Sequence, residues 1–168
     1  MLKKIARWRV PLGFAFGVLA LWLADPTRQS ILAGAVVALI GEAIRIWAAG
    51  HLEKSREVTA SGPYAWTRHP LYFGSTLIGI GLAIGAASIA VALLVLGYLA
   101  VTLTAAIRTE EAHLTEKFGA AYPEYRAGRH SVKRSFSVER ALRNRECRAA
   151  IGVVVVLAVL AGKVFFEG

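Results

Sequence analysis

The chain has 168 residues, 56% of them hydrophobic, and its mean hydropathy of +0.52 lies well above that of ordinary soluble domains. This composition excludes a typical soluble enzyme and indicates a protein of the lipid bilayer. The formal net charge is +9, with four cationic residues at 1–10, three at 51–69 and ten at 108–148. The positive-inside rule and attraction to anionic headgroups account for these clusters, so nucleic acid is not predicted as a partner.

Four apolar stretches predict about five membrane-spanning helices. Residues 10–24 are short for a span, whereas residues 31–50 are long enough to cross the hydrocarbon core. Residues 71–103 are too long for one span, and the small residues at 85–88 allow a tight reversal that divides them into a hairpin. The valine-rich stretch 149–166 is predicted as a helix because a lone strand cannot satisfy its backbone in lipid. The sequence therefore predicts an all-α, polytopic membrane bundle.

The charged segments predict how this bundle is oriented and organised. With the positive segments inside, we expect a cytoplasmic N-terminus and a cytoplasmic cap. Residues 108–117 are predicted to continue the fourth span out of the membrane as far as Gly119, and residues 126–148 to form an interfacial amphipathic segment. No repeat or second domain is evident, so residues 1–168 are expected to form one unit.

A polar and aromatic run at 62–74 precedes the third span. Pro70 suits the first position of a helix, so we expect free N–H groups at 71–73 to create an anion site at the membrane boundary. Arg68 and His69 add donors beside it. Ring faces and hydroxyls come from Tyr64 and Tyr72. Taken singly, each residue also fits an ordinary interfacial role, as a snorkelling cation, an aromatic belt or a helix cap.

A second polar group, Arg108-Thr109-Glu110-Glu111, lies where the fourth span leaves the membrane. Adjacent carboxylates at a lipid boundary are costly without partners, and glutamate oxygens can accept two hydrogen bonds from a vicinal diol. The alternative is that both glutamates pair with Arg108 or with the basic segment in water. The predicted hairpin places the start of span three beside the end of span four, so His69 is expected near Glu110.

Two features lie within the predicted spans. Glu42 and Arg45 share one face of the second span, where they form either a packing pair or part of a polar cavity. Gly81 and Gly85 have the spacing of close helix packing, with contact to a flat adenine as the alternative. No metal site is predicted, because the histidines lack the spacing of a closed site. They are His51, His69, His113 and His130.

These motifs resemble those of a known family. The resemblance rests on Ser61-Gly62-Pro63-Tyr64, Arg68-His69-Pro70-Leu71-Tyr72-Phe73-Gly74, Glu110-Glu111 and Phe118-Gly119-Ala120-Ala121-Tyr122-Pro123-Glu124-Tyr125. In order and spacing they resemble the isoprenylcysteine carboxyl methyltransferases and their phospholipid methyltransferase relatives. The resemblance covers residues 58–126, while the basic segment and last span at 127–168 are additional.

The resemblance implies that S-adenosyl-L-methionine is the cofactor and that a lipophilic acceptor enters from the membrane. It implies these cofactor-binding residues: Tyr64, His69, Pro70, Leu71, Tyr72 and Glu110. The candidates for positioning the acceptor are Glu42, Arg45, Arg108, Glu111 and His113. The carboxyl methyltransferase branch has an arginine where this chain has Ala106, so the acceptor stays open between an isoprenylcysteine carboxylate, a phospholipid amine and a small hydrophobic thiol.

A carboxylate or thiolate acceptor needs no general base, whereas an amine must first lose a proton. His113, Glu110 or Glu111 are the candidate bases for an amine. The competing hypothesis is a non-enzymatic membrane protein, such as a proton-coupled exporter that uses Glu42. The sequence makes no prediction of oligomeric state.

Overall fold

The computed structural model describes residues 2–54, 56–129 and 134–167, with the backbone alone for residues 2–12 and 167. These residues form helices joined by turns and irregular segments, and no strand occurs among them. The long helices are α1 (Leu2–Leu23), α2 (Arg28–His51), α3 (Pro70–Ala86), α4 (Ile89–Phe118) and α7 (Glu146–Glu167). The short ones are η1 (Gly62–Ala65), α5 (Ala121–Arg126) and α6 (Val138–Arg143).

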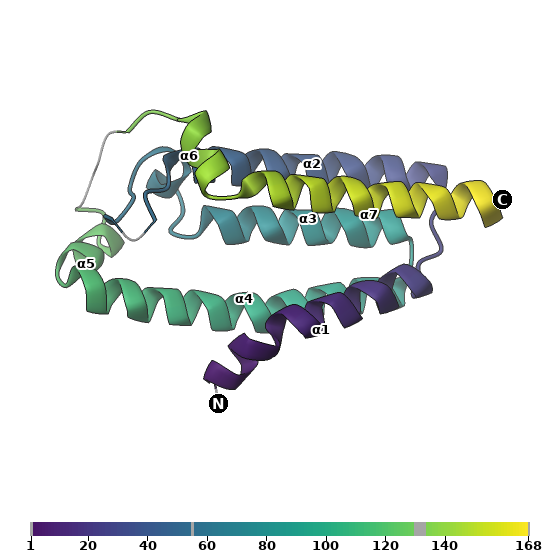
Figure 1. Cartoon of the computed structure of the whole chain (residues 1–168), viewed down its shortest axis with the longest axis horizontal. Coiled ribbons are helices and arrows are strands. Elements are labelled where there is room, and N and C mark those ends of the chain that lie inside the picture. The colour runs from purple at the N-terminus through teal and green to yellow at the C-terminus, as the bar shows by residue number, and fades with distance from the viewer. Residues whose placement is uncertain (1, 55, 130–133, 168) are drawn as a thin grey trace.

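The long helices lie side by side in two groups (Figure 1). Helix α2 packs against α3 and α7 in one group, while α1 packs against α4 in the other. Helix α3 also contacts α4 and so joins the groups. The irregular chain after α2, together with η1, α5 and α6, gathers at one end of the bundle (Figure 1). This end places polar residues from distant parts of the sequence near one another.

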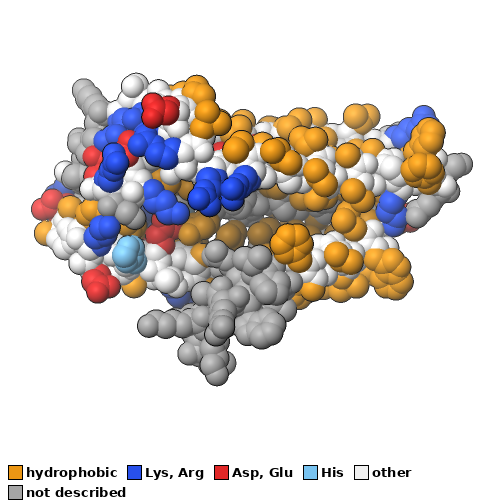
Figure 2. Space-filling model, in the orientation of Figure 1, with side chains coloured by type: hydrophobic (Ala, Val, Ile, Leu, Met, Phe, Trp, Pro, Cys, Tyr) orange, Lys and Arg blue, Asp and Glu red, His pale blue; other side chains and the backbone are white. Residues whose placement is uncertain are grey.

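Length and hydropathy confirm the predicted helical membrane bundle. Among the described residues, Arg28–His51, Ile89–Phe118 and Glu146–Phe166 are long and apolar enough to cross a membrane. Gly13–Leu23 and Pro70–Ala86 are shorter apolar helices. In Figure 2, hydrophobic side chains cover the shaft of the bundle, and charged side chains concentrate at the end that carries α5 and α6. A hydrophobic belt with a polar cap is the arrangement expected for this class of protein.

The predicted helical hairpin is confirmed by the chain at the end of α3. Ala87 adopts the left-handed conformation with φ of 48°, and the Ser88 hydroxyl accepts a hydrogen bond from the Val91 N–H at 3.5 Å. The prediction that the helix of the fourth span continues as far as Gly119 is also confirmed. It ends at Phe118, and Gly119 follows with φ of 52°, a backbone conformation that glycine adopts without steric cost.

Glycines hold α2 and α3 together. A Cβ atom at Gly34 would lie 2.3 Å from the Gly81 carbonyl oxygen, and one at Gly41 would lie 2.7 Å from the Gly74 carbonyl oxygen. Such close backbone approach is available only to residues without a side chain. Gly81 therefore packs against α2, which answers the choice between helix packing and adenine contact in favour of packing.

The basic segment at 126–148 differs from the single amphipathic segment that we expected. It contains the end of α5, the short helix α6 and the first turn of α7, which begins at Glu146 rather than at residue 149. Residues 130–133 of this segment lie outside the described residues. The difference arises because arginines in this segment bind the end of α2 and the chain that follows it, contacts that a local amphipathic pattern does not reveal.

Candidate cofactor and acceptor site

A cavity of about 490 Å³ lies at the polar end of the bundle. Its walls come from the chain after α2, η1, the start of α3, the second half of α4, and α5. All six residues predicted to bind the cofactor line it: Tyr64, His69, Pro70, Leu71, Tyr72 and Glu110. The hairpin accounts for this meeting, because it returns the end of α4 to the level at which α3 begins.

The start of α3 forms one wall of the cavity. Pro70 occupies the first helical position and is fully buried, as its missing N–H permits. We expected free N–H groups at 71–73, but Tyr72 and Phe73 both donate to the His69 carbonyl, at 3.1 and 3.0 Å. His69 precedes the helix, so its carbonyl accepts the first hydrogen bonds of the helix. The prediction of free amides is therefore wrong for Tyr72 and Phe73, whose N–H groups are already paired and cannot form the predicted anion site.

The adjacent glutamates have different surroundings. Glu111 is bound by the wall of the site: its Oε1 lies 3.1 Å from His69 Nε2 and 3.3 Å from Arg68 Nη1. Within the described part of the chain, nothing forms a hydrogen bond or ion pair with the Glu110 carboxylate, which lines the cavity. Glu111 thus contacts His69 and Arg68, whereas Glu110 lines the cavity. The alternative, in which both glutamates pair with Arg108 or the basic segment, does not hold for Glu111, whose partners are Arg68 and His69.

Helix α5 closes the cavity with two tyrosines. The Tyr125 hydroxyl donates to the Tyr64 carbonyl at 2.7 Å, which joins α5 to η1 across 61 residues of sequence. Burial raises the pKa of Tyr125 to about 12, against a smaller opposing effect of Arg68. Burial, with the nearby Glu111 carboxylate, also raises the pKa of Tyr122 to about 12. Both hydroxyls are therefore neutral at physiological pH.

The remaining cavity residues include several that the sequence did not single out. Glu53, Lys54 and Glu57 line it from the irregular chain after α2, and no regular pattern in that chain marks them. Tyr122 and Tyr125 belong to the family-like motif, which was the available signal for them. His113 lines the cavity one turn beyond Glu110 on α4, whereas Arg108 is exposed and is not a lining residue.

Glu42 and Arg45 are not among the residues that line this cavity. The main partner of Arg45 is Glu146 of α7, whose carboxylate lies within hydrogen-bond distance of Nε and Nη2, at 2.9 Å for the shortest contact. Arg45 Nη1 also donates to the Leu71 carbonyl at 3.4 Å. Glu42 is 5% exposed and lies 3.9 Å from Arg45 Nε. These residues join α2, α3 and α7 behind the cavity wall.

A second cavity, of about 410 Å³, lies between α3 and α4. It shares His69 and Tyr72 with the first cavity and continues along an apolar groove. The remaining lining residues are Phe73, Thr76, Leu96, Leu99, Ala100, Leu103, Thr104 and Ile107. Charged side chains such as Arg68 and Glu110 line the first cavity, here called the polar cavity, whereas, among the described residues, no Asp, Glu, Lys or Arg lines the second, here called the apolar groove; the two meet at the start of α3.

Comparison with known proteins agrees with this arrangement. The family model described as phospholipid methyltransferase matches residues 13–121. This chain belongs to that family. The match begins in α1 and ends in α5, so it includes the first two long helices, which the motifs alone had not linked to the family. The basic segment and α7 lie beyond it.

A curated relative is also similar. The chain is 30% identical over 132 residues to the cobalt-zinc-cadmium resistance protein CzcN of Cupriavidus metallidurans, an alignment that covers 73% of this chain. The alignment covers 58% of CzcN, so this chain spans little more than half the length of that relative. No solved structure matches this chain. The described residues contain no group of three or more His, Cys, Asp or Glu side chains arranged to hold a metal ion.

Proposed function

We propose that this protein is an S-adenosyl-L-methionine-dependent methyltransferase that methylates a lipophilic acceptor at the cytoplasmic face of a membrane. The observation that carries the proposal is the meeting of the polar cavity with the apolar groove at His69 and Tyr72. A polar cofactor and an apolar acceptor require two such compartments with a shared boundary. Membership of the phospholipid methyltransferase family supports the same reaction class.

The residues of the polar cavity fit this cofactor. Its volume of about 490 Å³ lies within the range of roughly 300–1,000 Å³ typical of small-molecule sites. The unpaired Glu110 carboxylate suits the ribose hydroxyls or the positively charged part of the cofactor. The tilted rings of His69 and Tyr72, with centroids 5.7 Å apart, provide aromatic faces. Arg68, at the same wall, supplies a cation for the methionine carboxylate.

S-adenosyl-L-methionine supplies a methyl group that a lone pair of the acceptor attacks while the carbon–sulfur bond breaks and sulfur keeps the bonding pair. The chain contributes alignment and exclusion of water, which are the main requirements of such a displacement. Glu111 fixes the His69 ring through its 3.1 Å contact, and the groove between α3 and α4 orients the apolar part of the acceptor. For an amine acceptor, His113 lies in the cavity to accept the proton that the amine must lose.

Calorimetric binding of S-adenosyl-L-homocysteine to the detergent-purified protein tests the cofactor site. We expect micromolar binding by the wild type and a loss of about tenfold or more in Glu110→Gln and His69→Ala, because each removes a polar contact within the cavity. Glu116→Gln is the matched control, since Glu116 lies exposed on the same helix and is not among the cavity residues. Unchanged binding in Glu110→Gln and His69→Ala would contradict the assigned site.

A membrane exporter that depends on Glu42 is the competing function. The observation in its favour is the Glu42 carboxylate, whose two oxygens are buried without a hydrogen-bond partner among the described residues. The relative CzcN is a resistance protein by name, which is compatible with either function. Glu42→Gln separates the two functions. The methyltransferase proposal predicts unchanged cofactor binding and methyl transfer, whereas the exporter hypothesis predicts loss of transport by the reconstituted protein.

A further inference from the structure

One wall of the polar cavity is irregular. The lining residues of the chain that leaves α2, here called the outer wall, are Leu52, Glu53, Lys54, Glu57, Val58 and Thr59. No helix or strand occurs among them, and a local contact of this wall is the Glu53 N–H donating to the Thr59 hydroxyl oxygen at 3.2 Å. Irregular backbone at a binding site needs support from a more rigid part of the structure.

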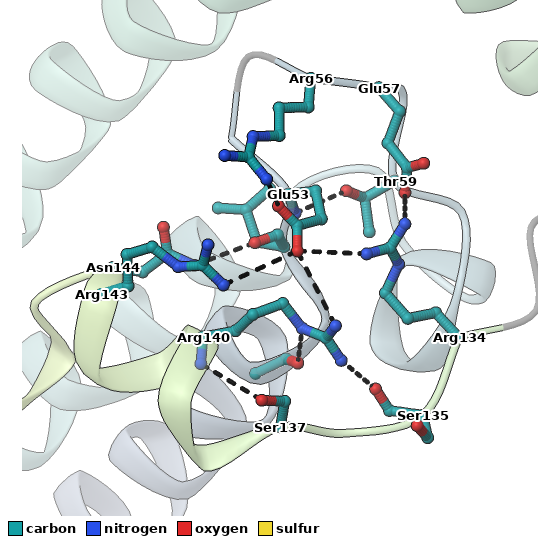
Figure 3. A network of polar contacts seen from close by, with 12 residues as sticks. Glu53, Arg56, Glu57, Thr59, Arg134, Ser135, Ser137, Arg140, Arg143 and Asn144 are labelled. Atoms are coloured by element: carbon teal, nitrogen blue, oxygen red, sulfur yellow. Dashed lines mark hydrogen bonds and ion pairs between the residues drawn. The ribbon is translucent and has the colours of Figure 1, made fainter.

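Arginines from beyond the family-matched region contact the outer wall (Figure 3). Arg134 bridges two of its carboxylates: Nη1 lies 3.2 Å from Glu53 and Nη2 lies 2.6 Å from Glu57. Arg140 adds a longer contact of 3.8 Å to Glu53. The side chains of Arg134, Glu53 and Glu57 are 24%, 13% and 32% exposed, so water screens these pairs less than it screens a fully exposed pair.

The same segment is anchored on α2. Arg140 Nε donates to the Gly50 carbonyl at 2.8 Å, and the Ser137 N–H donates to that carbonyl at 3.0 Å. The Asn144 amide donates to the Ala49 carbonyl at 2.9 Å (Figure 3). Carbonyls at the end of a helix lack partners within the helix, so these contacts cap α2. Residues 134–144, here called the clasp, thus bind a rigid helix end and the irregular wall together.

We propose that the clasp positions the outer wall of the methyltransferase site and that Arg134 is its central residue. Arg134 is not among the residues that line the cavity. It acts through Glu53 and Glu57, which line the cavity and which it contacts. The proposal rests on the proposed function and assigns a role to a segment outside residues 13–121. Without Arg134, Glu57 loses this partner, and Glu53 keeps only its longer contacts of 3.8–3.9 Å with Arg56, Arg140 and Arg143, so the wall is held less firmly.

Two measurements on Arg134→Gln test the clasp. The first is calorimetric affinity for S-adenosyl-L-homocysteine, which we expect to fall about three- to fivefold, the range for partly exposed ion pairs. The second is hydrogen exchange of the Glu53 backbone amide, which donates to the Thr59 hydroxyl oxygen and which we expect to exchange faster because the wall opens more often. Arg129→Gln is the control: Arg129 is exposed in the same basic segment, and we expect neither quantity to change.

Glu57→Gln removes the shorter of the two Arg134 contacts, at 2.6 Å, and is the variant to measure if Arg134→Gln does not fold. We expect the double variant to lose no more affinity than Arg134→Gln alone, because Arg134→Gln already removes the contact that Glu57→Gln removes. Unchanged exchange in both single variants overturns the clasp. Faster exchange with unchanged affinity overturns the positioning role. A folded wild type that does not bind S-adenosyl-L-homocysteine overturns the proposed function, and the exchange measurement still decides whether the clasp holds the wall.

Discussion

The two faces of α3 differ in how closely they approach their neighbours. On one face, a Cβ atom at Gly81 would lie 2.5 Å from the Gly34 carbonyl oxygen of α2, so the two backbones are in direct contact. On the other face, Tyr72 and Thr76, near the start of α3, line the groove of about 410 Å³, and farther along the helix Gly79 packs against Leu99 of α4. A single helix thus forms both a direct backbone contact with α2 and one wall of the groove.

This difference shows how a small membrane bundle can hold a site. Lipid tails are as apolar as the helix surfaces, so helices do not gain stability in a membrane simply by burying apolar area against each other. Close backbone packing supplies the attraction instead, and it fastens α3 to α2 through small residues. With α3 fixed on that face, the first turns of its opposite face can remain apart from α4 and leave the groove open.

The largest effect is expected from filling the glycine contact. Gly34→Leu places a side chain where a Cβ atom alone would meet backbone at 2.3 Å, so we expect α2 and α3 to separate at a cost of roughly 3 kcal/mol or more. Thermal unfolding in detergent measures this loss. Gly97→Leu is the control, since no atom lies within 4 Å of its added Cβ. Equal melting temperatures for Gly34→Leu and wild type would mean that the closely packed face is not the stabilising one.

A loss of stability is also expected where α7 contacts α2. Arg45→Gln leaves the Glu146 carboxylate, 8% exposed, without its charged partner, and breaking such a buried pair costs about 3 kcal/mol. Thermal unfolding again measures the change, with the exposed Arg28→Gln on α2 as control. An unchanged melting temperature in Arg45→Gln would show that α7 is held by its apolar contacts alone.

A functional effect without a loss of stability is expected from filling the open face. Leu96→Trp places a larger side chain in the groove, and we expect the KM for a long-chain acceptor to rise about tenfold while cofactor affinity stays unchanged. Leu93→Trp is the matched control because Leu93 is 69% exposed on the same helix and does not line the groove. If both variants bind and methylate the acceptor like wild type, the acceptor does not use this groove.

The smallest effect is expected at α5. Tyr125→Phe removes the 2.7 Å hydrogen bond to the Tyr64 carbonyl and should cost about 1 kcal/mol of stability. The pKa of Tyr125, raised to about 12 from an ordinary value near 10, means that folding favours the protonated hydroxyl. Its contribution is complete below about pH 10 and is lost as the pH rises through 12. Melting curves at pH 8 and pH 11 should therefore differ less in Tyr125→Phe than in wild type, and an equal difference would contradict this assignment.

Most of the fold was predictable because the patterns that define it are local. The small residues at 85–88 predicted the hairpin, and Gly119 predicted the end of α4. The hairpin then predicted that His69 and Glu110 would line one cavity, which the structure shows. These conclusions needed only hydrophobic run lengths and helix-terminating residues.

The missed features depend on long-range pairing. Glu42 and Arg45 were expected either to pair or to form part of a polar cavity, but the carboxylate closest to Arg45 is that of Glu146, 101 residues away. The contacts of Arg134 with Glu53 and Glu57 likewise join distant segments, and no periodic pattern identifies which of many arginines meets which carboxylate. Charge composition predicted a basic segment, but its partners depend on how the helices pack.

The most direct test of the account is methyl transfer by the purified protein in lipid nanodiscs. The protein would be incubated with methyl-tritiated S-adenosyl-L-methionine and one of three acceptors: phosphatidylethanolamine, a farnesylated cysteine or octanethiol. We predict tritium in the organic extract with at least one acceptor, and its loss in Glu110→Gln but not in Glu116→Gln. A folded wild type that neither binds S-adenosyl-L-homocysteine nor labels any acceptor would contradict the assignment of this site to methyl transfer.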